Sequence, residues 1–421
     1  MRIITLSKEE FDDYAVKHEY ASYFQTSNYA NFKAKMDGYE IHYLGFKDSN
    51  ELVGAAMLVF KELFWGYKFA YAPRGFLIDY SNLSICNEIS NGLKKLLKKQ
   101  KFIFIKIDPP IVYRKYDGEG NVDLTSESSK EILRSFKKNS YTHMGFNIYN
   151  ENMLPRFYTY AKLDSNPQIL FRSFTQERQD EITLDQKKAI IVTPDKDNNI
   201  DNFIDIASSI YKGRNARYIK LLFRMFDETN DAQIFYTMVD TKRYTENINK
   251  LYNDEVEINN NLKNIIEAND TKKYNMALVL NDKMLSDKRL AELKTNLDTS
   301  LKMIRNNPQG EIIGASIVIT SGKGVSIVGN YVDPTHRNLN ASPLTIYEIM
   351  KYYGKAGYSY IDLGSIPGDF DKNGKYYKVI KGKLGSNSSI VEYIGELDLV
   401  INPFIYQFYK SKLRRGKITI K

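Results

Sequence analysis

At 421 residues the chain is long enough for two or three domains with large hydrophobic cores. Lysine and arginine number 60 against 51 aspartate and glutamate, and the formal charge of +9 fits either an anionic partner or an ordinary lysine-rich surface. A single cysteine excludes an internal disulfide and a CxxC redox centre, and four histidines without HxxH or HExxH spacing predict no metal site.

The pattern of residues 1–160 predicts one mixed α/β domain. Runs of apolar, β-branched and aromatic residues predict strands at 41–47, 53–60, 68–80 and 101–108. A basic amphipathic helix is expected over residues 85–99. Lys33 lies on an earlier helix, where it either binds an anionic group or is an ordinary solvated lysine.

Two residues at strand ends in this domain are candidate site residues. Arg74 follows a strand beside Pro73, in a turn that could present its guanidinium to a carboxylate or phosphate of the substrate. Asp108 ends an apolar strand just before Pro109 and Pro110, which stop the strand ladder. An acid at this position can face a ligand, because α/β sheets bind ligands at the carboxyl ends of their strands. A capping acid that accepts backbone N–H groups is the alternative.

A second α/β domain is expected from residues 161–240 and 306–400. On one of its helices, Arg214 and Tyr218 lie four residues apart, able to hold a phosphate or stack a base, with a plain surface pair as the alternative. Near its end, Lys381 stands in a lysine cluster before a glycine turn. These amines could neutralise a diphosphate, or they belong to an exposed hairpin.

The segment between the two parts of this domain, residues 241–305, contains no glycine or proline. Its apolar residues recur at heptad spacing and each arm is too short to be stable alone, so we expect an antiparallel coiled-coil helical hairpin. The predicted seam consists of Ile248, Leu251, Ile258, Leu262, Ile265, Leu290, Leu297, Leu301 and Ile304. Such a hairpin could grip RNA, or it could be a structural or partner-docking arm.

The last residues, 401–421, form a basic C-terminal tail that is either attracted to anionic lipid or is a frayed solubilising end. No apolar run approaches the roughly 18 residues of a membrane span, and acids interrupt the stretch where a secretion signal would be apolar. We therefore expect a cytoplasmic protein, with peripheral contact at the inner face of the cell membrane.

An internal repeat links the two halves. Residues 50–60 (NELVGAAMLVF) are echoed by residues 310–320 (GEIIGASIVIT). In both halves an amphipathic helix follows, and then a buried strand carrying an acid, Asp108 in the first and Asp362 in the second. Two ordered matches at similar spacing favour duplication of one α/β unit over chance similarity of two buried strands. A cleft between such units is where we expect a ligand.

A loop that would hold coenzyme A is missing. Acetyltransferases built on this kind of unit cradle the pyrophosphate with an Arg/Gln-x-x-Gly-x-Gly/Ala loop that opens a helix. The corresponding segment, THRNLNASPLTIYEIM, has Arg337 but Asn340 and Ser342 in place of glycines. Coenzyme A is therefore not expected as a cofactor, and an acyl-CoA-dependent N-acyltransferase is only an alternative function.

Four sequence blocks stand in an order and spacing known from one protein family. They are residues 71–82 (YAPRGFLIDYSN), 104–109 (FIKIDP), 358–368 (YSYIDLGSIPG) and 379–403 (VIKGKLGSNSSIVEYIGELDLVINP). With these blocks and the inserted hairpin, almost the whole chain resembles the FemABX peptidyltransferases, which build interpeptide bridges in peptidoglycan. The duplication agrees with the twin acetyltransferase-like domains of that family.

The resemblance implies two tandem acetyltransferase-like domains with the coiled-coil hairpin inserted in the second. It also implies transfer of an amino acid from aminoacyl-tRNA to the side-chain amine at position three of the stem peptide. The implied partners are aminoacyl-tRNA, a lipid-linked or UDP-linked muropeptide precursor and related Fem-like proteins, with no cofactor besides the tRNA co-substrate. The positions that match the family's precursor-binding or transfer sites are Lys33, Asp108, Arg214, Tyr218 and Lys381.

The implied chemistry suits these residues. An aminoacyl ester is already activated, so transfer needs no cysteine or serine nucleophile and gains most from holding amine and ester together. The attacking amine, with a reference pKa of about 10.4, must lose a proton. We assign Asp108 to accept or steer that proton and Lys381 to stabilise the oxyanion. Substrate-assisted transfer, with Asp108 only orienting the amine, is equally compatible.

One stretch departs from the family pattern. Residues 173–188 (SFTQERQDEITLDQKK) contain several acids where relatives carry a strip rich in arginine and lysine. The loss of positive charge puts an RNA or phosphate contact here in doubt. A non-catalytic paralogue that acts as a binding protein is therefore a second alternative function.

Overall fold

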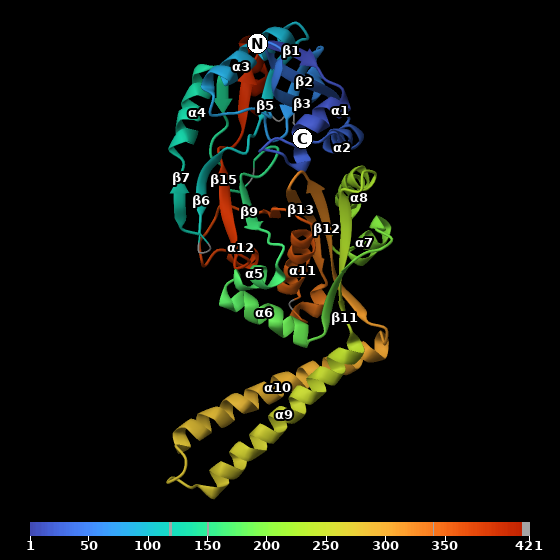
Figure 1. Ribbon diagram of the computed structural model, residues 1–421, viewed down its shortest axis with the longest axis vertical. Helices are drawn as coiled ribbons and strands as arrows, with labels where there is room; N and C mark the ends of the chain where they lie inside the picture. The colour runs from blue at the N-terminus through green and yellow to red at the C-terminus, as the bar shows by residue number, and fades with distance from the viewer. Residues whose placement is uncertain (118–119, 150, 340, 415–421) are drawn as a thin grey trace.

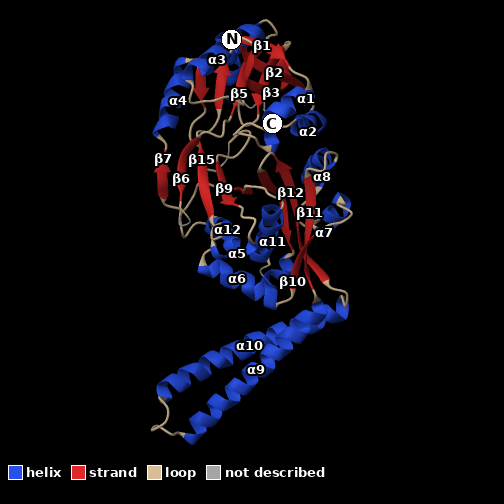
Figure 2. Ribbon diagram, viewed as in Figure 1, coloured by secondary structure: helices blue, strands red, loops and turns tan. Residues whose placement is uncertain are grey.

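The computed structural model describes residues 1–117, 120–149, 151–339 and 341–414. Two parts of the sequence analysis lie outside the described residues. They are residues 415–421 of the predicted basic tail, and Asn340 in the segment that was compared with the coenzyme A loop of acetyltransferases. Two β-sheets are flanked by helices, and a long helical hairpin projects beyond the second sheet (Figure 1). Figure 2 shows strands and helices mixed throughout both halves. The predicted α/β class is confirmed.

Among the described residues, the first sheet has seven strands, of which only β4 and β5 pair in parallel. Its spatial order is β1 (Arg2–Thr5), β2 (Glu40–Asp48), β3 (Glu51–Phe64), β4 (Tyr67–Ala72), β5 (Phe102–Ile107), β16 (Leu397–Val400) and β8 (Tyr141–His143). Every residue of β5 is buried, which explains its continuous apolar run.

Within the part of the chain that the structure describes, the second sheet has nine strands, of which only β13 and β14 pair in parallel. Its spatial order is β10 (Ile190–Pro194), β11 (Ala232–Val239), β12 (Glu311–Ser321), β13 (Gly324–Val332), β14 (Tyr360–Ser365), β9 (Phe157–Lys162), β15 (Ser388–Tyr393), β6 (Val112–Tyr116) and β7 (Val122–Thr125). The run from β10 to β14 therefore repeats the order and pairing of β1 to β5, which supports duplication.

The two sheets exchange strands. Strand β16 comes from the end of the chain but lies in the first sheet, whereas β6 and β7 come from the first half but lie in the second. Lys106 on β5 fixes β16 in place, because its buried Nζ lies 3.0 Å from Glu396 and 2.8 Å from Asp398. Strand pairing thus crosses residue 160, and the division into domains proposed from the sequence stays a prediction.

Helices cover both sheets, and they begin at residues that cap them. Side chains of Ser7, Thr26 and Asn82 accept backbone N–H groups at the starts of α1, α2 and α3. The helices are α1 (Lys8–Ala15), α2 (Ser27–Asp37), α3 (Leu83–Lys98), α4 (Glu127–Lys138), α5 (Pro167–Arg172), α6 (Gln176–Lys187), α7 (Ile200–Ile206), α8 (Gly213–Asp227), α11 (Ser342–Lys355), α12 (Tyr377–Lys383) and α13 (Pro403–Arg414), with short turns η1 (Tyr23–Gln25) and η2 (Pro334–Leu339). None of the helices in the described ranges combines the length and apolar character that a bilayer crossing requires.

The strand predicted over residues 68–80 ends early, at Ala72. Pro73 cannot donate to the ladder, and Arg74 and Gly75 take φ values of 55° and 77°. Glycine is needed at the second of these positions, because a Cβ there would lie 2.4 Å from the Tyr80 hydroxyl. The chain therefore turns sharply at the segment that carries Arg74.

One hydrophobic cluster spans both halves. It contains Phe69 and Phe104 of the first sheet together with Ile234 and Ile317 of the second. The two halves consequently share buried apolar surface, and this shared core holds them in a defined arrangement.

The insertion is a helical hairpin of α9 (Thr241–Ala268) and α10 (Met276–Asn306), which run in opposite directions (Figure 1). Its predicted coiled-coil packing is not confirmed. Leu251 and Ile258, placed in the seam by the heptad pattern, are 39% and 47% exposed. Between the helices lies a buried polar contact instead, in which Ser286 donates to Glu255 at 2.6 Å.

Candidate functional site

Two adjoining cavities open where β13 and β14 separate. These parallel strands pair over only three residues, ending at Ser326 with Asp362, and Gly364 at φ 91° then breaks the register of β14. The first cavity, of about 620 Å³, has several tyrosines in its wall, and we call it the tyrosine cavity. The second, of about 510 Å³, lies between β13, β14 and α11, and we call it the strand cavity.

Asp362 lines both cavities. The side chain is almost fully buried, and its Oδ1 accepts the N–H of Gly364 at 2.7 Å. Burial raises the pKa of this carboxyl to about 6, while the Gly364 hydrogen bond and the charges of Arg74 and Lys383 act in the opposite direction. A carboxyl that titrates near neutral pH and faces a cavity is suited to accept a proton from a bound group.

Lys383 supplies an amine to the wall of the strand cavity. Its Nζ donates to the carbonyl oxygen of Ser365 at 3.0 Å. Burial lowers the pKa of this amine, and the nearby negative charge of Asp362 raises it. The strand cavity therefore contains an acid and a base, positioned by β14 and by the end of α12.

Arg74 lies in the wall of the tyrosine cavity, among aromatic rings. The guanidinium carbon lies 4.6 Å from the ring centroid of Tyr158 and 5.1 Å from that of Tyr393. The Tyr393 hydroxyl in turn donates to the Tyr160 hydroxyl at 2.8 Å. Cation–π contacts of this kind stabilise a buried guanidinium. The position of Arg74 is compatible with its predicted role in substrate binding, which stays a prediction.

Asp108 lies behind Arg74 and lines neither cavity. It accepts the backbone N–H of Arg74 at 2.7 Å and the hydroxyl of Tyr71 at 3.0 Å, and its Oδ2 lies 3.6 Å from Arg74 Nη1. Burial raises the pKa of Asp108 to about 7, and the Arg74 charge partly offsets this rise. The structure thus brings two predicted site residues together, with Arg74 between Asp108 and the cavity.

Three other candidates meet around Asp37, between α2 and α8. Lys33 Nζ lies 2.5 Å from one carboxylate oxygen of Asp37, and Arg214 Nη2 lies 3.4 Å from the other. The Tyr218 ring packs edge-on against Phe32, with centroids 4.9 Å apart. Lys33 is mostly buried, whereas the Arg214 side chain is 64% exposed and therefore accessible to an anion. This group, here called the Asp37 cluster, is separate from Asp108.

Lys381 stands apart from the other candidates, on α12 in the wall of a wider pocket of about 910 Å³. Its Nζ lies 2.8 Å from Glu177, and the hydrogen bond and charge of that carboxylate raise the pKa of the amine. Both side chains are exposed, and neither lines the tyrosine or the strand cavity. A role for Lys381 in oxyanion stabilisation stays a prediction.

The atypical stretch 173–188 supports the Lys381 pocket. Arg178 is buried and donates to the carbonyl oxygens of Gly382 and Leu384 at 3.0 Å and 2.8 Å. These bonds satisfy acceptors at the end of α12, so Arg178 fixes the helix that carries Lys381. Two acids of the stretch, Glu177 and Glu181, face the pocket, which makes its surface less positive.

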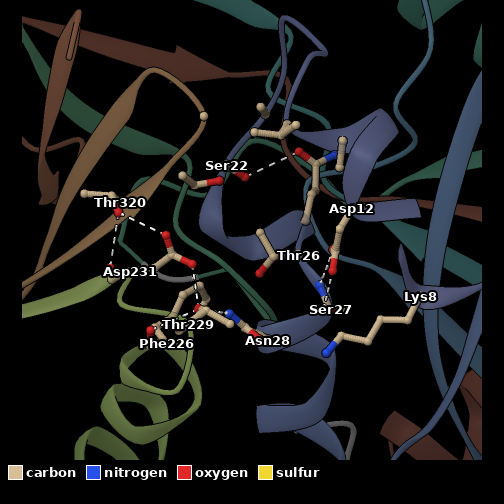
Figure 3. A pocket seen from close by; sticks show the side chains of 16 residues that line it. Lys8, Asp12, Ser22, Thr26, Ser27, Asn28, Phe226, Thr229, Asp231 and Thr320 are labelled. Atoms are coloured by element: carbon tan, nitrogen blue, oxygen red, sulfur yellow. Dashed lines mark hydrogen bonds between the residues drawn. The ribbon is translucent and has the colours of Figure 1, made fainter. Parts of the chain in front are cut away.

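A fourth, small pocket of about 200 Å³ lies between the first helices and the end of β12 (Figure 3). Its polar side chains bond to one another: Asn28 donates to Thr229 at 2.8 Å, and Thr229 donates to Asp231 at 2.6 Å. Thr320 of β12 contacts the same aspartate at 3.4 Å. The Asn28–Thr229 bond joins the two halves, so we interpret the pocket as part of their interface.

Several cavity residues carry little or no signal in the sequence. Asp362 has one, because the internal repeat aligns it with Asp108. Lys383 also has one, because it belongs to the lysine cluster before the glycine turn. Tyr158 and Tyr393 have none, since nothing local distinguishes them from other strand tyrosines. Their selection depends on strands that come from distant parts of the chain.

Comparisons with known proteins agree with this architecture. The sequence model of the FemAB family matches residues 6–412. The chain is 23% identical over 434 residues to a lipid II:glycine glycyltransferase of Staphylococcus aureus strain MSSA476, covering 100% of this chain and 98% of that protein. The enzyme of strain USA300 is also 23% identical, over 435 residues. The crystal structure of FemX aligns with a TM-score of 0.73 and 21% identity, over 97% of this chain and 99% of that one, which shows a common fold.

Proposed function

This chain belongs to the FemAB family, and we propose that it transfers an amino acid from aminoacyl-tRNA to the side-chain amine of the third stem-peptide residue of a peptidoglycan precursor. Its relatives are named for glycine transfer and for lipid II. Glycyl-tRNA and a lipid-linked precursor are therefore the first donor and acceptor to test.

The observation that carries this proposal is the buried carboxyl of Asp362 at the junction of two cavities. A transferase of this kind must bring two substrates to one point, and two cavities that meet at a titratable acid provide such a point. The acyl donor is activated as an ester, so the site requires neither a cysteine nor a serine nucleophile.

In the proposed reaction, the acceptor amine attacks the ester carbonyl carbon. An amide bond forms, the ester bond to the ribose oxygen breaks, and one proton leaves the amine. Asp362 accepts that proton and returns it to the ribose oxygen as the tRNA leaves. The oxyanion that develops on the carbonyl requires a positive or hydrogen-bonding group. Lys383 lies on the strand cavity, and Lys381 is the candidate from the neighbouring pocket.

We assign the remaining candidates to binding. Arg74 faces the tyrosine cavity, and Asp108 holds it there. Lys33 and Arg214 form a cationic group that can exchange its contact with Asp37 for precursor phosphates.

The proposal is tested by incubating the protein with charged tRNA and precursor and weighing the product by mass spectrometry. We expect one added residue with glycyl-, seryl- or alanyl-tRNA and none with uncharged tRNA. Absence of product with all three donors would contradict the proposal. Precursor binding without turnover would support the non-catalytic alternative, and tight acetyl-CoA binding in calorimetry would support an acyl-CoA-dependent one.

A further inference from the structure

The tip of the β3–β4 hairpin carries an exposed tryptophan, Trp65, which is 68% exposed and is the single tryptophan of the chain. Phe64 pairs with Tyr67 across the hairpin, so Trp65 and Gly66 form a two-residue turn with φ values of 53° and 74°. Asn-Gly is the usual pair for such a turn, and a bulky residue in the left-handed region is disfavoured. The backbone therefore gives no reason for tryptophan here, and its ring is directed outward.

Helix α13 places further aromatic rings beside this tip. Phe408 stacks on Trp65, with centroids 5.3 Å apart and planes at 23°. Phe404, one turn earlier on the same face, is 82% exposed. The opposite face of the helix is buried, since Tyr406 and Tyr409 pack on Phe104. The outer rings are therefore not needed to hold α13 against the protein.

Two lysines lie near the tip of this hairpin. Lys412 Nζ lies 4.9 Å from the centroid of Phe408 and 5.2 Å from that of Trp65. Lys101 Nζ lies on the other side of the turn, 3.6 Å from the position a Cβ would take on Gly66. We call Trp65, Phe404, Phe408, Lys101 and Lys412 the aromatic–lysine surface. One acid lies close by, Glu62, whose carboxylate accepts the Gly66 N–H at 2.8 Å.

We propose that the aromatic–lysine surface docks on an anionic lipid bilayer. Tryptophan and phenylalanine side chains favour the membrane–water interface, where their rings enter the acyl boundary while lysines pair with lipid phosphates. Each lysine near an anionic surface adds to the attraction. A single-stranded RNA would instead need a groove, and these rings line none of the four cavities described above. Charge and shape therefore favour the membrane.

Strand β3 connects this surface with the Asp37 cluster. Lys61 lies on that strand, four residues before Trp65, or about 13 Å at strand spacing. Its Nζ lies 4.6 Å from the ring centroid of Tyr39, and Lys33 Nζ lies 5.0 Å from the same centroid. Docking would thus hold Lys33 close to the headgroup layer. This part of the inference rests on the proposed function, in which Lys33 binds the phosphates of a lipid-linked precursor.

The test uses the full chain with vesicles of phosphatidylglycerol and, separately, of phosphatidylcholine. The single tryptophan reports directly on the surface, so binding to the anionic vesicles should shift its emission to the blue. Phe404→Ser should weaken vesicle binding about tenfold, because it removes a largely exposed ring that would enter the interface. Lys412→Ala should weaken it about fivefold, and added salt should reduce that difference.

Leu278→Ser, on α10, is the matched control, because it removes a 61% exposed apolar side chain far along the hairpin and should leave vesicle binding unchanged. Unshifted tryptophan emission with anionic vesicles would overturn the proposal, as would equal losses in Phe404→Ser and the control. If the tryptophan emission shifts with RNA but not with vesicles, the aromatic–lysine surface binds RNA instead of a membrane.

Vesicle binding needs neither the aminoacyl donor nor the peptide acceptor. The vesicle experiment therefore tests membrane docking even if the proposed transfer does not occur. If transfer occurs, Phe404→Ser should slow it with a lipid-linked acceptor in vesicles and leave the rate with a soluble UDP-linked acceptor unchanged. Equal slowing with both acceptors would mean that the substitution damages the protein, and the membrane role would be withdrawn.

Discussion

The two halves of the molecule use the same parallel strand pair in opposite ways. In the first half, β4 and β5 stay paired to their last residues, Ala72 and Ile107, and Asp108 directly after them is locked to Arg74. In the second half, β13 and β14 separate at Asp362, and two cavities meet there. Duplication supplied two parallel strand pairs, of which one became a rigid support and the other an open site.

The hydrogen bonds of the two acids explain this difference. Asp108 accepts from Tyr71 and Arg74 and lies beside a buried guanidinium, so its removal leaves buried polar groups without partners. Asp362 accepts one backbone N–H, from Gly364, and its environment is a cavity wall. The first acid should therefore matter mainly for stability and the second mainly for chemistry.

The largest effect is expected at Asp362, where β13 and β14 separate. Asp362→Asn should lower kcat about 100- to 10,000-fold, the range of a general base, while the affinity for precursor stays within about threefold of the parent. The free energy of unfolding should change by about 1 kcal/mol or less, because asparagine can still accept the Gly364 N–H. Single-turnover rates and urea unfolding measure the two quantities. A variant with parental turnover would remove Asp362 from the reaction.

Asp108, directly after the closed strand pair, should affect stability more than turnover. Asp108→Ala leaves the Arg74 guanidinium buried without its carboxylate and should lower the free energy of unfolding by about 3 to 5 kcal/mol in urea titration. Asp108→Asn keeps an acceptor for the Arg74 N–H, so the fold should persist, and turnover should fall far less than in Asp362→Asn. Full stability of Asp108→Ala would contradict the support role, and activity of Asp108→Asn within a few fold of the parent would limit Asp108 to a structural role.

The pH dependence of the reaction sharpens the same comparison. The folded-state pKa of Asp362 is raised to about 6, so kcat should fall as pH drops through this value and the base becomes protonated. Asp362→Asn should lose this acidic limb. The raised pKa also has a consequence for folding: the contribution of Asp362 to stability is fully present below the unfolded value near 3.8 and is lost as pH rises through about 6. A pH-independent rate in the parent between pH values of about 5 and 7 would argue against Asp362 as the base.

The Asp37 cluster should affect binding rather than turnover. Lys33→Ala and Arg214→Ala should each weaken precursor affinity about 10- to 100-fold, as expected for one charge-assisted contact of about 1.5 to 3 kcal/mol. Arg224→Ala is the matched control, since Arg224 is an exposed arginine on the same helix that pairs with Asp201 instead. Calorimetry with the precursor measures all three. Unchanged affinity in both cluster variants would remove the cluster from the precursor site.

The helical hairpin should give the smallest effect. At its base, Tyr244, Ile248 and Met303 are buried in the core of the second half, so an excision of residues 244–305 would open that core. Replacing residues 251–296 with a Gly/Ser linker spares these side chains and should leave both sheets folded. Precursor affinity should persist, whereas affinity for charged tRNA should fall, and added salt should reduce the difference. Equal tRNA affinity with and without the arm would make it a structural or partner-docking element.

Local sequence patterns were sufficient for the class of fold and for several of its elements. Predicted strands 41–47 and 53–60 lie within β2 and β3, and the helix predicted over 85–99 corresponds to α3. Apolar periodicity and turn residues act over a few positions, so they can be identified without knowing what packs against them. The repeat likewise identified equivalent strands in the two halves, and the four family blocks identified the family.

The tertiary structure decided the rest, because it depends on partners far apart in the chain. Lys106 contacts Glu396, 290 positions later, and this pairing places β16 in the first sheet. The heptad pattern placed Leu251 and Ile258 in the seam of the hairpin, yet both are exposed, and the polar pair Glu255 and Ser286 is buried between the helices instead. Asp108 directly follows β5 and Asp362 lies within β14, and the two segments are similar in sequence, yet one acid is enclosed and the other faces a cavity. Whether a strand pair stays closed or opens into a cavity depends on the side chains that pack over it. These side chains come from distant parts of the chain, so local sequence patterns do not reveal the contacts.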